Sequence, residues 1–337
     1  MGRGRELPPT GRGLGLRYLA HDVLVNGLLR PGADTAYADG DDSAWLEIDW
    51  PAMTRTVELE GGPVRVVDTG GSGPPLLFVH GLAGVWQNWL LNIPAFMDAH
   101  RVIAPDLPGF GASPMPSWPI SIRGYGKALD ALCGALEVED PVVVGNSMGG
   151  FVAAELAISF PTRVKRLVLV SAVGLSLEYQ RREPLLTLAR VWASAATRVG
   201  VRSEAVLRRP RLRRAALQSV LRYPEKLSLP LAWELVQGAG KPGFVPAMEA
   251  LLDYAFRDKL AAIEVPVLIV WGRNDMLVPV TDAAEFERLI GANARKVVFE
   301  DTGHVPMLER PSRFNELLRG FLAGELEPEA DVEGVSR

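Results

Sequence analysis

Apolar residues follow two different periods along this chain. From residue 75 onward, short continuous runs rich in Val, Ile and Leu alternate with longer segments in which apolar residues recur every three or four positions. Continuous apolar runs are typical of strands buried on both faces, and the longer period is typical of amphipathic helices. The alternation predicts an α/β fold with a mostly parallel, doubly wound sheet that carries helices on both faces.

Eight segments are expected to form strands. Residues 54–60 and 63–70 are joined by a Gly-Gly turn and should form an antiparallel edge of the sheet. The expected parallel strands are 75–81, 101–105, 141–145, 164–172, 265–272 and 294–300. The helical patterns include residues 121–137, the segment FVAAELAISF that begins at residue 151, and residues 311–323.

One region breaks the alternation between two sheet strands. Residues 176–260 contain helical patterns and no convincing strand, so we expect them to form a helical cap inserted into the fold. The core domain is then expected over residues 51–175 and 261–325, and residues 326–337 are expected to form a flexible C-terminal tail.

The first fifty residues do not share the pattern of the core. Residues 1–50 are expected to be an N-terminal extension, with an amphipathic helix at 14–29 followed by a Pro/Gly/Asp-rich linker at 31–42. Residues 1–30 carry five arginines and two acidic residues around an apolar stripe. We expect the helix to pack on the protein, and the alternative is a weak contact with a membrane surface.

Composition narrows the class of protein. The 337 residues are 48% hydrophobic and 23% charged, which is ordinary for a globular protein with a sizeable core, and the net charge of −4 gives no reason to expect nucleic-acid binding. A single cysteine, Cys133, excludes an intrachain disulfide, and its apolar helical surroundings indicate a buried, inert thiol. No apolar run approaches the ~18 residues of a membrane span, and no signal peptide is evident, so a cytoplasmic location is expected, peripheral at the membrane if the N-terminal helix makes that contact.

Charge is distributed unevenly between the cap and the rest of the chain. The expected cap carries 15 Lys and Arg against 8 Asp and Glu, a net charge of +7, which leaves −11 for the remainder. The basic residues peak at 207–214, where the chain reads LRRPRLRR. Either these arginines form a solvated helix face, or they attract an anionic substrate to the mouth of the site.

Ser147 lies between an apolar strand and an apolar helix, in the sequence Gly145-Asn146-Ser147-Met148-Gly149. This matches the G-x-S-x-G nucleophile elbow, a sharp strand-to-helix turn that holds a serine clear of both elements. The glycines have a steric reason, because a Cβ at either position would meet the neighbouring backbone. By itself the pattern could also be a packed turn.

A serine hydroxyl needs a base, and the base needs an acid to orient it. Of the four histidines, only His304 lies between the last strand and the last helix, at the edge of the sheet where ligands bind. His80 is expected to shape the loop that follows it, and His100 lies at the opposite end of the sheet. Asp275 follows another strand and is the candidate acid. The negative charge that develops on a substrate oxygen would be held by the backbone amides of Met148 and Leu82.

Five segments together resemble the α/β-hydrolase superfamily, over about residues 54 to 323. They are FVHGLAG (78–84), DLPGFGAS (106–113), VVGNSMGG (143–150), WGRNDMLVP (271–279) and DTGHVPMLERP (301–311). The order Ser147, Asp275, His304 is the order of the triad in that superfamily. The resemblance implies a structural role for Asp106. We read Asp301 and Glu309 as local hydrogen-bonding or solvated charges.

The nucleophile separates branches of the superfamily. The related haloalkane dehalogenases and epoxide hydrolases use aspartate where this chain has Ser147. The sequence NSMGG resembles hydrolases that cleave carbon–carbon bonds in meta-cleavage products of aromatic degradation. That group usually has a tryptophan after the catalytic histidine, where this chain has Val305, and a cap arginine for the substrate carboxylate, for which Arg181 or Arg182 are candidates.

We therefore expect a serine hydrolase without metal or other cofactor that cleaves carboxylic esters through an acyl-enzyme. Its partner would be a small-molecule ester or other carbonyl compound, and the positive cap favours an anionic one. The alternatives are a carbon–carbon bond hydrolase acting on meta-cleavage dienoates, and a hydrolase-like receptor that binds a signalling ligand.

Overall fold

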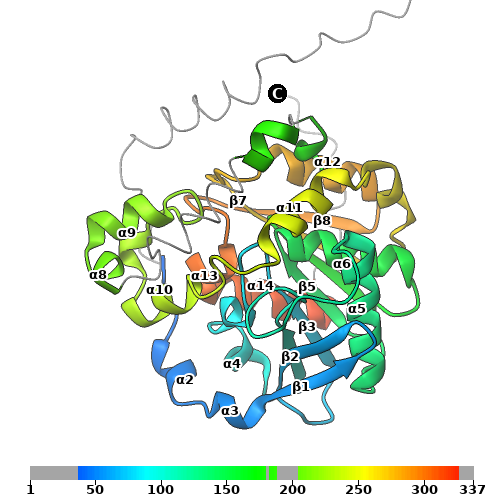
Figure 1. Ribbon diagram of the computed structural model, residues 1–337, viewed down its shortest axis with the longest axis horizontal. Helices are drawn as coiled ribbons and strands as arrows, with labels where there is room; N and C mark the ends of the chain where they lie inside the picture. The colour runs from blue at the N-terminus through cyan, green and yellow to red at the C-terminus, as the bar shows by residue number, and fades with distance from the viewer. Residues whose placement is uncertain (1–36, 180–181, 188–203, 326–337) are drawn as a thin grey trace, which may run out of the picture. The chain divides into compact units, whose positions relative to one another are not determined.

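The computed structural model describes residues 37–179, 182–187 and 204–325. Within them one sheet contains eight strands in the order β1-β2-β4-β3-β5-β6-β7-β8 (Figure 1). The pairings of β1 with β2 and of β2 with β4 are antiparallel, and the other five are parallel. The predicted α/β fold, with a mostly parallel sheet and an antiparallel edge, is confirmed.

The ends of every strand agree with the predicted segments to within two residues. They are β1 Thr54–Leu59, β2 Gly62–Asp68, β3 Pro75–Val79, β4 Arg101–Pro105, β5 Val142–Asn146, β6 Arg166–Val170, β7 Val267–Gly272 and β8 Ala294–Phe299. β6 is shorter than the predicted 164–172. Ser171 has φ 45°, a left-handed conformation that does not continue a strand, so the ladder ends at Val170.

Helices and one 3-10 helix outside the cap region cover the sheet. They are α2 Asp42–Leu46, α3 Trp50–Met53, η1 Trp86–Trp89, α4 Ile93–Phe96, α5 Ile122–Ala135, α6 Met148–Ser159, α12 Thr281–Ile290, α13 Pro306–Glu309 and α14 Pro311–Ala323. α14 has the predicted bounds. α2 and α3 were not predicted: Asp41 and Asp49, which looked like loop residues, cap them by accepting hydrogen bonds from Ser43 N and Ala52 N.

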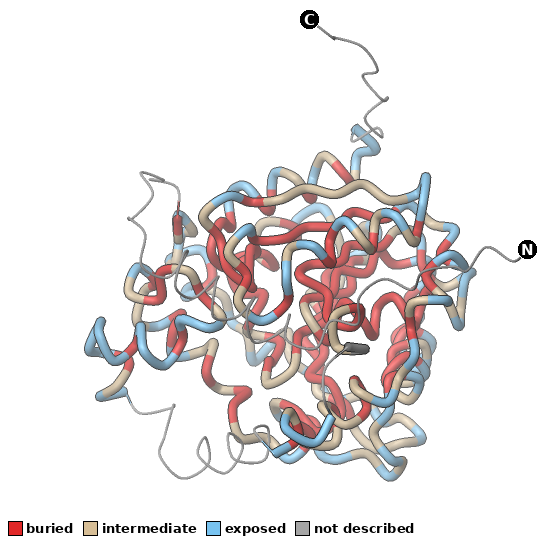
Figure 2. Tube along the Cα trace, turned by 90° about the horizontal axis from the view of Figure 1, so that it is seen from above, coloured by how far each residue is buried: buried red, intermediate tan, exposed pale blue. Residues whose placement is uncertain are grey.

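Two apolar clusters lie on the two faces of the sheet. Val143 belongs to the cluster that contains residues of α5, α6 and α12, whereas Val142 and Val144 belong to the cluster that contains residues of η1, α4 and α14. This alternation follows from the period of two in a strand. Figure 2 shows the buried segments gathered in the interior, with exposed segments around them. The continuous apolar runs are therefore buried on both sides, as their composition predicted.

The described residues between β6 and β7 are helical or irregular, and none of them belongs to a strand. They include η2 Ser176–Tyr179, helical residues 182–187, α8 Glu204–Leu207, α9 Pro210–Leu217, η3 Pro224–Lys226, α10 Leu229–Leu235, α11 Phe244–Asp253 and η4 Arg257–Ala262. Figure 1 shows α8, α9 and α10 grouped together. The boundaries of a cap at 176–260 remain a prediction.

Three sequence expectations fall outside the described residues, namely the helix at 14–29, the tail at 326–337 and the side chain of Arg181. In the part of the chain that is described, no helix combines the length and the apolar character that crossing a membrane requires. Cys133 lies in the core, and burial raises the pKa of its thiol to about 12. The thiol is therefore protonated at neutral pH and a poor nucleophile.

Candidate active site

Ser147 occupies the turn between β5 and α6 in a conformation that few residues adopt. Its φ is 55°, and a positive φ is uncommon for a residue with a side chain. Its backbone N–H donates to Val170 O at 2.9 Å, which ties the turn to the end of β6. The side chain is half-buried. The turn therefore presents a hydroxyl at the carboxyl edge of the sheet, where the strand-to-helix pattern predicted it.

The two glycines of the elbow are required by close backbone contacts. A Cβ on Gly145 would lie 2.3 Å from Gly149 O, and a Cβ on Gly149 would lie 2.2 Å from Val79 O and 2.5 Å from His80 O. Real Cβ atoms do not approach backbone oxygens so closely. The glycines thus allow α6 to begin directly against the end of β3.

His304 and Asp275 form a buried pair at the same edge. His304 Nδ1 lies 2.8 Å from Asp275 Oδ2, and both residues are about 95% buried. The other carboxylate oxygen, Oδ1, accepts the N–H groups of Leu277 and Val278, each at 2.9 Å. Asp275 is therefore held in place by its own loop. Because its carboxylate accepts a hydrogen bond from His304 Nδ1, the neutral imidazole carries its proton on Nδ1. Nε2 is left as the basic nitrogen.

The side chain of Asn146 joins the segment of Ser147 to that of His304. Asn146, the residue before Ser147, donates from Nδ2 to His304 O at 3.2 Å and to Val170 O at 3.1 Å. Within the described residues, neither Ser147 Oγ nor His304 Nε2 forms a hydrogen bond. Such contacts in unliganded sites often close only when substrate binds. The three predicted residues are thus on neighbouring loops, with the histidine–aspartate contact already made.

The loop expected to supply the second oxyanion donor lies against Ser147. A Cβ on Gly81 would be 3.0 Å from Ser147 Cβ, and Gly84 N donates to Gly81 O at 3.0 Å, which closes a turn over Leu82 and Ala83. In the described part of the chain, the amides of Leu82 and Met148 donate to no protein group. Both N–H groups are therefore available for a ligand oxygen.

Two further residues hold this loop in place. His80 is fully buried; Leu107 N donates to its Nε2 at 2.9 Å, so Nδ1 carries the proton and donates to Gly81 O at 2.8 Å. Burial lowers the pKa of His80, which favours this neutral form. Asp106 accepts Trp86 N at 2.9 Å and Ala112 N at 2.8 Å. Both side chains join loops, which agrees with the structural roles expected for them.

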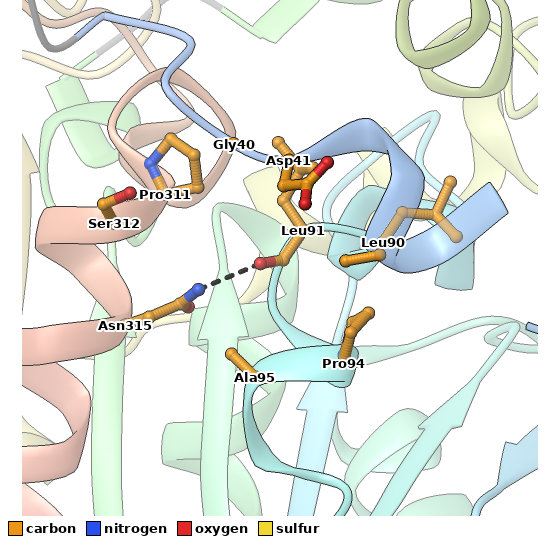
Figure 3. Close-up of a pocket in the computed structure, with 10 residues that line it drawn as sticks. Gly40, Asp41, Leu90, Leu91, Pro94, Ala95, Pro311, Ser312 and Asn315 are labelled. Carbon is orange, nitrogen blue, oxygen red and sulfur yellow. Dashed lines mark hydrogen bonds between the residues drawn. The ribbon is translucent and has the colours of Figure 1, made fainter. Parts of the chain in front are cut away.

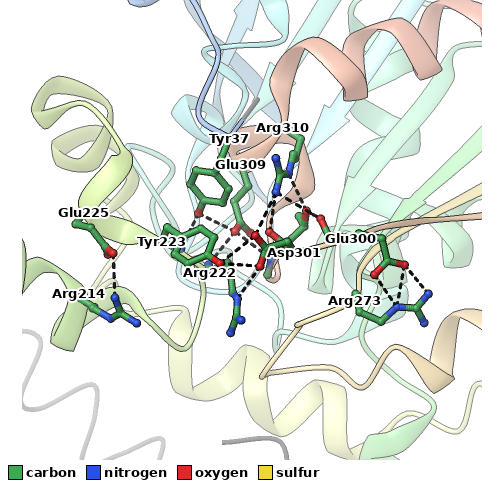
Figure 4. Close-up of polar contacts among 12 residues, drawn as sticks. Tyr37, Arg214, Arg222, Tyr223, Glu225, Arg273, Glu300, Asp301, Glu309 and Arg310 are labelled. Atoms are coloured by element: carbon green, nitrogen blue, oxygen red, sulfur yellow. Dashed lines mark hydrogen bonds and ion pairs between the residues drawn. The ribbon is translucent and has the colours of Figure 1, made fainter. Parts of the chain in front are cut away.

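Glu309 was expected to be either a local hydrogen-bonding group or a solvated charge, and the structure shows the first. It is fully buried, and its carboxylate accepts hydrogen bonds (Figure 4). Asp301 accepts from Arg222 Nε at 3.2 Å and from the Tyr223 hydroxyl at 2.8 Å. The loop that carries His304, residues 300–305 between β8 and α13, is called the histidine loop below. It contacts residues 222–223, and no local sequence signal reveals this contact.

The expected arginines have different surroundings. Arg182 pairs with Asp253 at 3.0 Å on the surface. Arg213 is 7% exposed and donates to Glu225 O at 2.7 Å, so it is not one of the solvated cations that the basic cluster suggested. Arg208 and Arg214 pair with Glu204 and Glu225, whereas Arg209 and Arg211 are exposed and form no ion pair in the described part of the chain.

A pocket of about 200 Å³ lies elsewhere, between α2, the η1–α4 segment and α14 (Figure 3). Its lining includes Gly40, Leu91, Pro94 and Asn315 and none of the three candidate triad residues. Among the described residues, no group of three or more His, Cys, Asp and Glu side chains is placed to hold a metal ion.

Comparisons with known proteins give the same fold. The family model described as alpha/beta hydrolase fold matches residues 74–311. The chain is 32% identical to 2-hydroxymuconate semialdehyde hydrolase of Pseudomonas sp. (strain CF600), over 85% of this chain and 98% of that protein. It is 30% identical to the dihydrolipoyllysine-residue acetyltransferase component of the acetoin cleaving system of Cupriavidus necator, over 86% of this chain and 74% of that protein. A solved meta-cleavage product hydrolase is 27% identical, with a TM-score of 0.65, over 81% of this chain and 98% of that chain.

Proposed function

Because the chain belongs to the alpha/beta hydrolase fold family, we propose that it is a serine hydrolase that cleaves small carboxylic esters. The observation that carries this proposal is the buried contact of 2.8 Å between His304 Nδ1 and Asp275 Oδ2, at the sheet edge where Ser147 occupies a strained turn. Hydrolysis of an ester requires nothing beyond a nucleophile, a base and an oxyanion site.

In the first half of the proposed reaction, Ser147 Oγ attacks the ester carbonyl carbon. His304 Nε2 takes the hydroxyl proton, and Asp275 stabilises the imidazolium that results. The Leu82 and Met148 amides donate to the oxyanion. Collapse of the tetrahedral intermediate breaks the bond to the alcohol oxygen, which receives the proton from His304 and leaves.

In the second half, a water molecule attacks the acyl-enzyme carbonyl carbon. His304 takes one proton of that water, and the second tetrahedral intermediate collapses with release of the carboxylic acid. The proton on His304 returns to Ser147 Oγ. The cycle therefore restores the Ser147 hydroxyl and the neutral His304 imidazole, and it consumes no oxidant or reductant.

A second candidate is hydrolysis of a carbon–carbon bond in a meta-cleavage dienoate. It is favoured by the identity of 32% to a protein named 2-hydroxymuconate semialdehyde hydrolase. In that reaction the leaving group is a carbon, so its electron pair has to be delocalised into a conjugated dienolate before a proton is added. Val305 follows the histidine where that group usually has tryptophan, which is the sequence departure against this candidate.

Steady-state kinetics on matched substrates test the proposal. We expect turnover of p-nitrophenyl esters of increasing acyl length, and a maximum at one length that reports the size of the acyl site. A 2-hydroxy-6-oxo-dienoate is assayed beside them. Faster turnover of the dienoate than of every ester would replace the first candidate with the second, and a stall after one equivalent of product would indicate a ligand receptor.

Two exposed arginines at the start of α9, the N-cap Arg209 and Arg211, lead to a prediction about the charge of the substrate. Exposed positive charge raises the local concentration of anions, and salt screens this effect beyond ~10 Å at 0.1 M. Changing Arg209 and Arg211 to Gln should therefore reduce the salt dependence of kcat/KM for a carboxylate-bearing ester and leave a neutral ester of the same length unaffected. Changing Lys127 and Lys165 to Gln is the matched control, because both are exposed, form no ion pair in the described part of the chain, and lie outside this region. Equal salt responses of the two esters on the unmodified protein would contradict the prediction.

A further inference from the structure

The backbone N–H groups of His304 and of its two neighbours in the chain all donate hydrogen bonds. Gly303 N donates to Glu309 Oε2 at 3.0 Å, and Val305 N donates to Glu309 Oε1 at 3.3 Å. His304 N donates to Val220 O at 2.9 Å. One buried carboxylate therefore accepts the amides on both sides of the histidine, and a carbonyl from the region between β6 and β7 accepts the amide of the histidine itself.

The same carboxylate is shared with the N-terminal segment. Glu309 Oε2 accepts the Tyr37 hydroxyl at 2.8 Å and Arg222 N at 2.8 Å (Figure 4). The Tyr37 hydroxyl in turn accepts Tyr223 N at 2.9 Å. Tyr37 thus bridges the carboxylate that fixes the histidine loop and the segment that packs on that loop.

Tyr37 is buried and packs against neighbouring side chains. It is 6% exposed, its ring meets the Tyr223 ring at 5.1 Å in an edge-on contact, and Arg310 Cζ lies 5.2 Å from its centroid. Burial and the nearby Glu309 raise the pKa of the Tyr37 hydroxyl well above its usual value, so it remains a donor. The segment is anchored further by Ala38 N, which donates to Glu309 O at 2.8 Å.

We propose that Tyr37 is a positioning residue for His304: through Glu309 it sets the place of the histidine loop and ties that loop to residues 220–223. Tyr37 lies before β1 and outside the residues 74–311 that match the family model, yet its hydroxyl reaches Glu309 in the histidine loop's supporting contacts. The inference rests on the proposed function, because it assumes that His304 is the base for Ser147.

Active-site titration with a p-nitrophenyl phosphonate separates positioning from folding. The amplitude of p-nitrophenol release counts competent sites, and the rate constant reports how well the base activates Ser147. Tyr37→Phe keeps the ring contacts and removes only the hydroxyl. We expect one equivalent of release with a rate constant lowered about tenfold, since errors of about 1 Å in the placement of catalytic groups cost up to ~100-fold.

Tyr254→Phe is the matched control. The Tyr254 hydroxyl also donates to a buried glutamate, Glu155, and accepts a hydrogen bond, from Lys259 Nζ at 2.9 Å, but it belongs to a cluster around α6 rather than the histidine loop. The Tyr254→Phe protein should be less stable, and its rate constant for p-nitrophenol release should be unchanged. In a Glu309→Gln background, Tyr37→Phe should have little further effect on the rate constant, because the two residues act through one contact.

An unchanged rate constant in Tyr37→Phe, with or without a lower amplitude, would reduce Tyr37 to a stability role and overturn the inference. An equal fall in rate for Tyr254→Phe would overturn it as well, since the effect would then not depend on the histidine loop. Absence of label on Ser147 in the unmodified protein would instead refute the proposed function and, with it, the inference.

Discussion

Replacing Ser147 or His304 with Ala is expected to lower kcat by about 10⁶-fold, and Asp275→Asn by about 10⁴-fold, on the scale of the serine proteases. In the proposed reaction Ser147 supplies the attacking oxygen and His304 the base, so removing either residue stops the same step. The Ser147→Ala/His304→Ala double variant should consequently be little slower than either single variant. Asp275→Asn keeps the shape of the side chain but no longer favours the proton on His304 Nδ1.

The matched control for these variants is His100→Ala. His100 lies before β4 at the opposite end of the sheet, where its ring packs on Phe96. Its replacement should therefore leave kcat unchanged. Steady-state assays on the best ester, with circular dichroism to confirm folding, provide the measurement. A folded Ser147→Ala protein with about one per cent of the original kcat would exceed the residual rates known for such variants by a wide margin and would refute the assignment.

Gly149→Ala is expected to prevent folding or to destabilise the protein by more than about 4 kcal/mol, a loss that single substitutions rarely reach. Its Cβ would meet Val79 O and His80 O, which are backbone atoms at the end of a central strand and have no room to move. Relief would require α6 to shift away from β3, which would displace Ser147 as well. Urea unfolding and the yield of soluble protein measure the effect.

Gly134→Ala serves as the control for the same substitution. Gly134 is an exposed residue near the end of α5, and no atom lies within 4 Å of the position its Cβ would take. Alanine should stabilise the helix there by about 0.5 kcal/mol, because it restricts the unfolded chain more than glycine does. A folded, active Gly149→Ala protein would contradict the account of the elbow.

The sheet was predictable because its strands are buried on both faces and therefore read as continuous apolar runs. The ends of the strands were less predictable: the apolar pattern ran from Val164 to Ala172, whereas β6 spans Arg166–Val170, and the left-handed conformation of Ser171 has no signal in the apolar pattern. α2 and α3 were missed because helices of five and four residues are too short to display a period. Their capping aspartates are equally common in turns.

The candidate triad was predictable because each member follows a strand within a short local motif. The support of the histidine loop was not, because its partners are remote in sequence: 87 residues separate Arg222 from Glu309, and 272 separate Tyr37 from Glu309. Buried Glu309 looked like any charged residue near a helix start. Only the folded chain brings four N–H and O–H donors to one carboxylate.

The distance in sequence between Ser147 and His304 has a consequence for protein synthesis. A ribosome adds about 5–20 residues per second, so the strands through β6 leave it well before His304 and Glu309 are made. A nascent chain can already build the turn that carries Ser147, yet it has no base to activate that hydroxyl. We therefore expect chains that terminate before residue 304 to be inert fragments, and hydrolytic activity to appear only after His304 has been translated and has left the ribosome.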